Sequence, residues 1–357
     1  MEHRRKFIKK IIKLRNMKYP YLLLVALFFL NACSLHSTKG KNVNEPIVLA
    51  YVTSRGPNLP DPTYITHINY AFGGVNNTFN GIRINNEDRL MAITGLKQQK
   101  PTLKVLLSIG GWGSGRFSEM AADETTRLAF ATDCKRVVDH FNLDGIDMDW
   151  EYPTSSMSGI SSLPEDIDNF TLLMRDIRNA IGKDKLLTFA SAANAKYVDF
   201  KAVNLYIDFV NIMTYDIAHP PYHQAGLYRS EFTKDLSCEE SVLAHIAAGV
   251  PVHKLTLGIP FYGHGCCGIA RDVVYKDIVT KPEFDIYTKK WDDVAKAPYF
   301  TNEEGAFVLT YDDPRSIAEK CEFIHRMGML GAMYWQYDQD DDDGTLQKAV
   351  FNGLYNK

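Results

Sequence analysis

Short apolar runs alternate with longer amphipathic segments along most of this chain. The runs are rich in β-branched and aromatic residues, which is typical of buried strands, and they cover residues 47–53, 66–72, 103–109, 143–151, 186–192, 207–215, 255–261 and 330–337. Strands separated by helix-length segments pair in parallel. Eight such units predict an α/β fold, a closed (β/α)8 TIM barrel over residues 47–357.

One intervening segment has clear helical signals. Ser162 and Glu165 have capping-box spacing, with Pro164 near the expected first turn. Apolar residues then recur at helical spacing and predict an inward face of Ile167, Phe170, Leu173, Met174, Ile177 and Ile181. The interval between the seventh and eighth strands is too long for one helix, so we expect an inserted subdomain at about 264–312.

The first 32 residues differ from the remainder. They hold eight Lys or Arg and one acid, followed by the apolar run Tyr21 to Leu30, which is too short to span a bilayer but fits a signal-peptide core. The sequence Leu30-Asn31-Ala32-Cys33 resembles a bacterial lipoprotein signal. We therefore expect a signal peptide over residues 1–32, lipidation at Cys33 and a polar tether over 33–46. The resemblance implies a lipoprotein of the bacterial cell envelope.

Two alternatives remain open in this region. An ordinary cleaved signal peptide would make Cys33 incidental, and translation could begin at Met17 instead of Met1. Without residues 1–32 the chain has 32 basic and 42 acidic side chains, a formal charge of −10. This acidic balance argues against nucleic acid as a partner and suits a neutral ligand such as a sugar.

The fourth predicted strand carries the chemistry. Because strand side chains alternate with period two, Asp147, Asp149 and Glu151 share one face of the strand. Carboxylates this close cannot all stay ionised in a low-dielectric site, so at least one should hold a proton near neutral pH. Glu151 lies at the C-terminal end of the strand, where barrel enzymes place their reactive groups, and is the predicted general acid.

A metal site or a structural acid cluster is the alternative for this stripe. A metal would need converging ligands from elsewhere, and no pair of histidines accompanies the strand. We therefore expect no metal and no cofactor.

Four segments together resemble glycoside hydrolase family 18. The run Asp144-Gly145-Ile-Asp147-Met-Asp149-Trp-Glu151 matches the family's DxxDxDxE signature, and the Tyr152-Pro153 that follows resembles its chitinase branch. The other matching segments are Ser108-Ile-Gly110-Gly111-Trp112, Met213-Thr-Tyr215-Asp216 and Gly331-Ala-Met-Tyr-Trp335.

The resemblance implies a role for each matching residue. Glu151 would be the acid and later the base, Asp149 would bind the substrate's N-acetyl group and share a proton with Glu151, and Asp147 would support Asp149. Tyr215 would donate a hydrogen bond to the acetamido carbonyl. Met213, Asp216 and Trp335 would bind the sugar, with Trp335 as its platform. The structural motif residues would be Asp144, Gly145, Ser108, Gly110 and Gly111.

Further binding candidates rest on weaker signals. Aromatic faces stack on pyranose rings, and the candidates are Trp112, Tyr152 and Phe72, together with the cation Arg229. Compared with larger members of the family, the insertion looks like a shortened α+β subdomain, which favours shorter or more open substrates.

The resemblance implies a retaining enzyme that cleaves β-1,4 N-acetylglucosamine linkages in chitin or its oligomers, and we expect it to be a monomer. In this family the substrate's own acetamido group replaces a carboxylate nucleophile, through an oxazolinium intermediate. Two alternatives remain: an endo-β-N-acetylglucosaminidase that acts on N-glycans, and a non-catalytic chitin-binding lectin on the same barrel.

Overall fold

The computed structural model describes residues 45–356. The predicted signal peptide, Cys33 and almost all of the predicted tether lie outside the described residues. Within residues 45–356, no helix is long and apolar enough to cross a bilayer. The same part of the chain holds no cluster of His, Cys, Asp and Glu side chains with the arrangement of a metal site.

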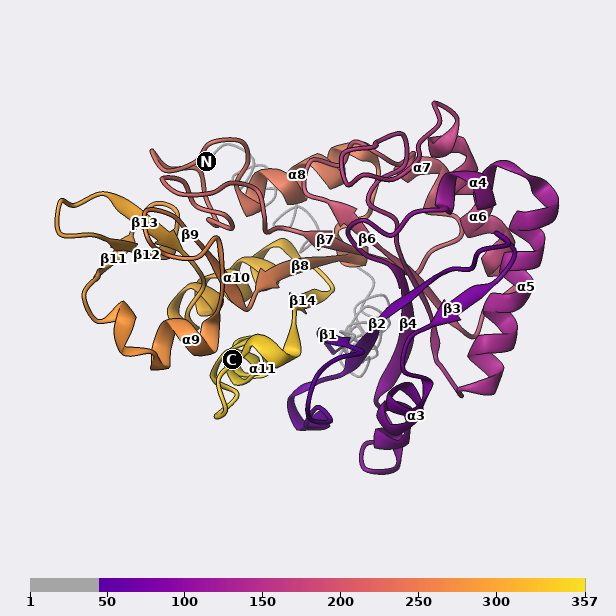
Figure 1. Cartoon of the computed structure of the whole chain (residues 1–357), viewed down its shortest axis with the longest axis horizontal. Helices are drawn as coiled ribbons and strands as arrows, with labels where there is room; N and C mark the ends of the chain where they lie inside the picture. Colours follow the sequence, from indigo (N-terminus) through magenta and orange to yellow (C-terminus); the bar gives the residue numbers. More distant parts are fainter. Residues whose placement is uncertain (1–44, 357) are drawn as a thin grey trace, which may run out of the picture. The chain divides into compact units, whose positions relative to one another are not determined.

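Eight parallel strands form a closed barrel, which confirms the fold predicted from the apolar runs (Figure 1). Closure comes from the pairing of the first barrel strand with both the second and the last. The barrel strands are β1 (Ile47–Thr53), β2 (His67–Val75), β4 (Lys104–Gly110), β5 (Gly145–Asp149), β6 (Leu186–Ala192), β7 (Phe209–Met213), β8 (Leu255–Pro260) and β14 (Gly331–Trp335). A short strand, β3 (Ile82–Ile84), extends β2 as an antiparallel hairpin.

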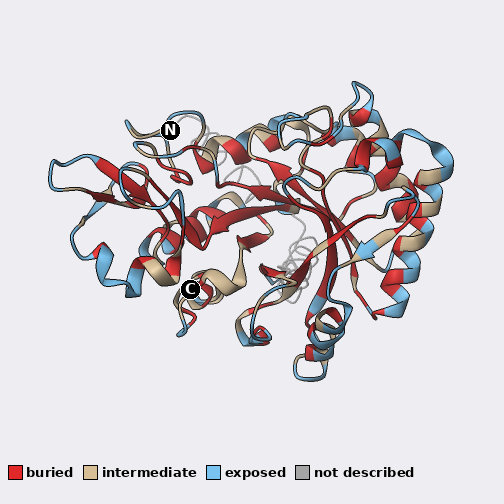
Figure 2. Cartoon of the chain, viewed as in Figure 1, coloured by how far each residue is buried: buried red, intermediate tan, exposed pale blue. Residues whose placement is uncertain are grey.

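Helices follow the barrel strands and cover their outer face. Figure 2 shows the strands buried almost throughout, while the helices bury only the side that faces the barrel. The first strand is followed only by a short 3-10 helix, η1 (Pro62–Tyr64). The helices are α3 (Glu87–Gly95), α4 (Phe117–Ala122), α5 (Glu124–His140), α6 (Asp166–Ile181), α7 (Phe200–Val203), α8 (Cys238–Ala248), α9 (Tyr275–Thr280), α10 (Pro314–Met327) and α11 (Thr345–Tyr355).

Helix α6 corrects one local prediction. Helix α6 begins at Asp166, and Glu165 precedes it without a capping hydrogen bond from its side chain, so the predicted capping box at Ser162 is wrong. The Asp166 carboxylate replaces it by accepting hydrogen bonds from the Leu163 amide at 2.7 Å and the Ser118 hydroxyl at 2.8 Å. The predicted inward face is otherwise confirmed, because its residues from Phe170 to Ile181 are buried.

The predicted insertion is a small α+β unit between β8 and β14. Its antiparallel sheet has the order β10-β9-β13-β12-β11, and α9 packs beside it. The strands are β9 (Tyr262–Gly265), β10 (Asp272–Val274), β11 (Thr288–Asp292), β12 (Ala297–Thr301) and β13 (Phe307–Thr310). Because β9 begins two residues after β8 ends, the insertion starts directly at the edge of the barrel mouth.

Candidate active site

The acid stripe lies on β5, between β4 and β6. Asp147 is level with Ser108 on one side and with Thr188 on the other, and Asp149 is level with Gly110. The first residue of β5 is Gly145, and a larger residue does not fit there because its Cβ would overlap the carbonyl oxygen of Leu186. The strand can therefore approach β6 closely and carry its acidic side chains into the barrel.

Asp147 is fully buried and saturated with hydrogen bonds. Its Oδ2 accepts from the hydroxyls of Tyr51 and Ser108, both at 2.8 Å. Its Oδ1 accepts from the Thr188 hydroxyl at 2.6 Å and the Asn211 amide at 3.1 Å. Burial raises the pKa of Asp147, and these four donors oppose that rise. Because every oxygen is occupied by a donor from another strand, this carboxyl is fixed in place beneath Asp149.

Asp149 is the least satisfied acid of the stripe. It is 4% exposed, and its Oδ1 atom is buried without any hydrogen-bond partner among the described residues. Burial, then Glu151, then Asp147 raise its pKa well above the usual value. A buried oxygen without a partner is costly, so it is suited to receive a polar group from a ligand.

Glu151 lies two residues beyond the end of β5, at the mouth of the barrel. Burial raises the pKa of Glu151 to about 7; a hydrogen bond from the Tyr152 hydroxyl opposes this shift, and Asp216 adds to it. The carboxyls of Asp149 and Glu151 therefore hold at least one proton near neutral pH. A carboxylic acid with a pKa in this range can both donate and accept a proton at neutral pH, as general acid–base catalysis requires.

Tyr215 and Met213 come from the end of β7. Both side chains are buried, and the Tyr215 hydroxyl has only a weak contact, 3.8 Å to the sulfur of Met333. Burial, then Asp149 and Asp216, raise the pKa of Tyr215, so the phenol stays a neutral donor. Its hydroxyl is therefore available to a ligand.

Asp216 is tied to the insertion by two residues of β9, of which His264 carried no signal in the sequence. Its Oδ1 accepts from the Tyr262 hydroxyl at 2.6 Å and lies 2.7 Å from Nε2 of His264, both on β9. Nδ1 of His264 lies 2.9 Å from Asp272. Burial alone would raise the pKa of Asp216, but the bonds to His264 and Tyr262 outweigh it and hold the pKa below the usual value. The Asp216 side chain is still 58% exposed, so it remains open to a ligand.

Aromatic rings form one wall beside the acids. Trp335, at the end of β14, stacks on Phe72 with a centroid distance of 5.6 Å, and it contacts Tyr51 at the same distance. Tyr51 in turn donates to Asp147. The predicted platform and the predicted acid support are therefore linked through a single ring.

Two glycines let β4 pass close to these groups. Gly110 and Gly111 have φ angles of 135° and 91°. A Cβ at Gly110 would overlap the carbonyl oxygen of Asp149, and one at Gly111 would lie 2.6 Å from the Phe72 ring. Glycine is required at both positions because of the backbone angle and the lack of space.

The remaining predicted residues lie in three different places. Trp112 is 61% exposed at the barrel mouth and contacts Tyr152 edge-on at 6.4 Å, and Tyr152 stacks on Tyr197. Asp144 stays at the base of β5, where it accepts from the Val105 amide and pairs with Lys97. Arg229 does not contact the acid stripe. Its guanidinium instead donates hydrogen bonds to both carboxylate oxygens of Glu240.

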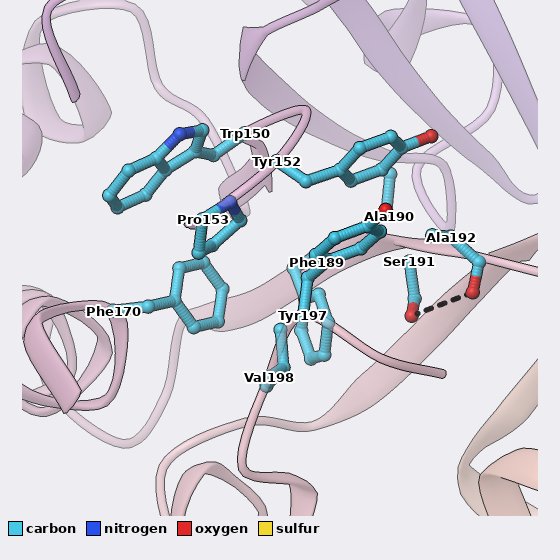
Figure 3. A pocket seen from close by; sticks show the side chains of 10 residues that line it. All are labelled: Trp150, Tyr152, Pro153, Phe170, Phe189, Ala190, Ser191, Ala192, Tyr197 and Val198. Carbon is cyan, nitrogen blue, oxygen red and sulfur yellow. Dashed lines mark hydrogen bonds between the residues drawn. The ribbon is translucent and has the colours of Figure 1, made fainter. Parts of the chain in front are cut away.

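A small cavity lies behind the stripe. Figure 3 shows Trp150, Tyr152 and Pro153 on one side of it and Phe189 and Tyr197 on the other. Its volume is about 10 Å³, which has room for about one water and none for a sugar. The space for a ligand lies instead at the barrel mouth, beside Phe72 and Trp335.

Comparison with known proteins assigns this site to a class of glycan-cleaving barrels. The family model of the glycosyl hydrolases family 18 matches residues 47–340, and the chain belongs to this family. Chitinase A1 of Niallia circulans is 31% identical over 81% of this chain and 55% of its own length. Probable chitinase 2 of Drosophila melanogaster is 29% identical over 92% of this chain and 80% of its own. This chain thus spans only about half of Chitinase A1.

A solved structure agrees with this assignment. A family 18 N-acetylglucosaminidase from Paenibacillus barengoltzii is 32% identical and superposes with a TM-score of 0.78. The match covers 87% of this chain and all of that one. The protein is therefore a chitinase-like member of a hydrolase family.

Proposed function

We propose that this protein hydrolyses β-1,4 linkages of N-acetylglucosamine, in chitin or its oligomers, with retention of configuration. The observation that carries the proposal is the pairing of Glu151, with a pKa of about 7, with a buried Asp149 that has an unpartnered oxygen. Glu151 can protonate the leaving oxygen, and Asp149 can hold the substrate's acetamido group in one orientation.

In the proposed first step, Glu151 donates its proton to the glycosidic oxygen as the bond to the anomeric carbon breaks. The oxygen of the substrate's acetamido group attacks the same carbon and forms an oxazolinium ion, the route that this family takes in place of a carboxylate nucleophile. Asp149 accepts a hydrogen bond from the acetamido N–H, and the Tyr215 hydroxyl donates a hydrogen bond to the acetamido oxygen. These contacts orient the group and stabilise the charge that develops on it.

In the proposed second step, Glu151 removes a proton from water, which attacks the anomeric carbon from the face that the leaving group occupied. The oxazolinium ring opens and the product retains the β configuration. Asp147 lies below Asp149, and its four hydrogen bonds keep it in place while the shared proton moves between Asp149 and Glu151. Trp335 would lie under the reacting sugar.

The test is Glu151→Gln with a fluorogenic conjugate of chitobiose or chitotriose. We expect turnover to fall about a thousandfold or more, because the amide cannot donate the proton, while oligomer binding stays within about threefold. Arg229→Gln is the control, since its guanidinium is engaged with Glu240. Turnover of Glu151→Gln near the wild-type rate would contradict the proposal.

The same chemistry would serve an endo-β-N-acetylglucosaminidase that acts on N-glycans. A glycoprotein substrate tested beside the chitobiose conjugate separates the two functions. A chitin-binding lectin would bind oligomers without turnover in either assay. We also propose that Cys33 carries the lipid that holds the enzyme in the bacterial envelope; labelling with a fatty-acid analogue, with and without Cys33→Ser, tests this.

A further inference from the structure

An open pocket of about 570 Å³ adjoins the stacked rings of Phe72 and Trp335. It lies between the segments that follow β1, β4 and β14 and the hairpin of β2 and β3, which carries Arg83, and Trp112 is part of its wall. Its volume is in the range of pockets that enclose small ligands. A glycan whose reacting sugar sits at Trp335 would continue into this pocket.

The charge of the pocket is opposite to that of the chain. Arg55 and Arg83 line it, and no acidic side chain does. Residues 33–357 have a formal charge of −10. With this acidic composition, a pocket that has two cationic side chains and no acidic one is unexpected. Asp338 accepts from Thr53 at 3.5 Å behind this wall and does not line the pocket.

Both guanidinium groups also keep free donors. Within residues 45–356, Arg55 has neither an ion pair nor a hydrogen bond, and Arg83 donates only to the neutral Asn85 amide oxygen at 2.9 Å. Two other arginines of the barrel are paired with acids: Arg127 with Asp176, and Arg178 with Asp208. The two pocket arginines thus have the donors that a planar anion such as a carboxylate needs.

We propose that this pocket binds a carboxylate on a neighbouring sugar of the same glycan. The natural substrate would then be a polymer in which N-acetylglucosamine alternates with a carboxylated sugar, and the reacting N-acetylglucosamine would still supply its acetamido group. The inference rests on the proposed function for the cleavage step. Two sources share this chemistry, a lactyl ether on an N-acetylated sugar and a uronic acid.

Binding to the Glu151→Gln protein tests the inference without turnover. Three tetrasaccharides are compared by calorimetry: neutral chitotetraose, one with lactyl ethers on alternate sugars, and one with glucuronic acid on alternate sugars. We expect one of the two anionic ligands to bind about tenfold more tightly than chitotetraose at low salt. The advantage should shrink as salt is raised towards 1 M, because the pocket is open and its charges are screened.

Removing the arginines should abolish the difference. With Arg55→Gln and Arg83→Gln added, the anionic ligand should lose about tenfold in affinity, and chitotetraose should change less than about twofold. Adding Arg229→Gln instead should change neither. Equal affinity for all three ligands, or an advantage that survives loss of both arginines, would overturn the inference.

The two proposals can fail separately. Cleavage of chitotetraose by the wild-type enzyme with no preference for an anionic ligand would leave the proposed function intact and remove this inference. Tighter, arginine-dependent binding of an anionic ligand, by a wild-type enzyme that cleaves neither this ligand nor chitotetraose, would support the pocket and contradict the proposed function.

Discussion

Asp216 and His264 are 48 residues apart in sequence, yet Oδ1 of the first and Nε2 of the second are 2.7 Å apart. Asp216 follows barrel strand β7, and His264 lies on β9 of the insertion, so this contact fixes the insertion against the barrel mouth. It also adjusts charge at the site, because His264 contributes to the lowered pKa of Asp216, and Asp216 in turn raises the pKa of Glu151.

We predict that His264→Phe moves the acid limb of the kcat/KM profile to higher pH. Loss of the histidine raises the pKa of Asp216, so its carboxylate is protonated at a pH where the wild-type group is still ionised. A pH profile on a chitotriose conjugate measures this. His264→Gln, which can still donate a hydrogen bond, should shift less, and His253→Phe on the exposed turn η3 (Val252–Lys254) should not shift it. An unchanged acid limb in His264→Phe would show that Asp216 does not titrate in this range.

Tyr152→Phe should move the basic limb of the same profile upward. The Tyr152 hydroxyl stabilises the ionised Glu151 carboxylate and so opposes the rise in its pKa. Without this donor the acid form of Glu151 persists to higher pH. The loss of activity above pH 7 should therefore begin at a higher pH than in the wild type. A downward or absent shift would mean that Tyr152 does not act on Glu151.

The sequence alone predicted the barrel from eight apolar runs, the insertion from the length of one interval, and the shared face of the acids from strand alternation with period two. Each of these is a local signal. Asp147 illustrates what the sequence could not provide. Its four partners, Tyr51, Ser108, Thr188 and Asn211, come from four other strands, and only closure of the barrel brings them together. His264 was missed for the same reason, since nothing near it in sequence marks it as a partner of Asp216.

The start of α6 was mispredicted for a different physical reason. The Ser162 to Glu165 spacing is a local signal, but Asp166 is held by Ser118 from another helix, and this tertiary contact decides where the helix begins.

Gly110→Ala should destabilise the protein by about 3 kcal/mol or more and abolish activity. The added methyl group meets the Asp149 carbonyl oxygen, and the φ of 135° is strained for alanine. Chemical denaturation measures the loss. Gly95→Ala, in α3 with open space around the position, is the matched control and should be neutral or stabilising by up to about 1 kcal/mol. Equal stability of the two variants would contradict this account of β4.

Glu151→Gln should raise the thermal midpoint at pH 8 and leave it nearly unchanged at pH 4. The folded-state pKa of about 7 lies above the usual value of 4.5, so the carboxyl contributes stability at low pH that is lost as pH rises between these two values. Glutamine removes the charge that burial disfavours. Scanning calorimetry at both pH values measures the effect, and Glu240→Gln, whose pKa is lowered by Arg229, should lower the midpoint at pH 8 instead. A lower midpoint for Glu151→Gln at pH 8 would contradict the raised pKa.

The most direct test of the central claim is the anomeric configuration of the first product. Proton NMR during the first minutes of chitotetraose hydrolysis, before mutarotation, should show the β-anomer of the newly formed reducing end. Direct attack by water without the acetamido group would give the α-anomer first, and that result would contradict the mechanism built on Glu151, Asp149 and Tyr215.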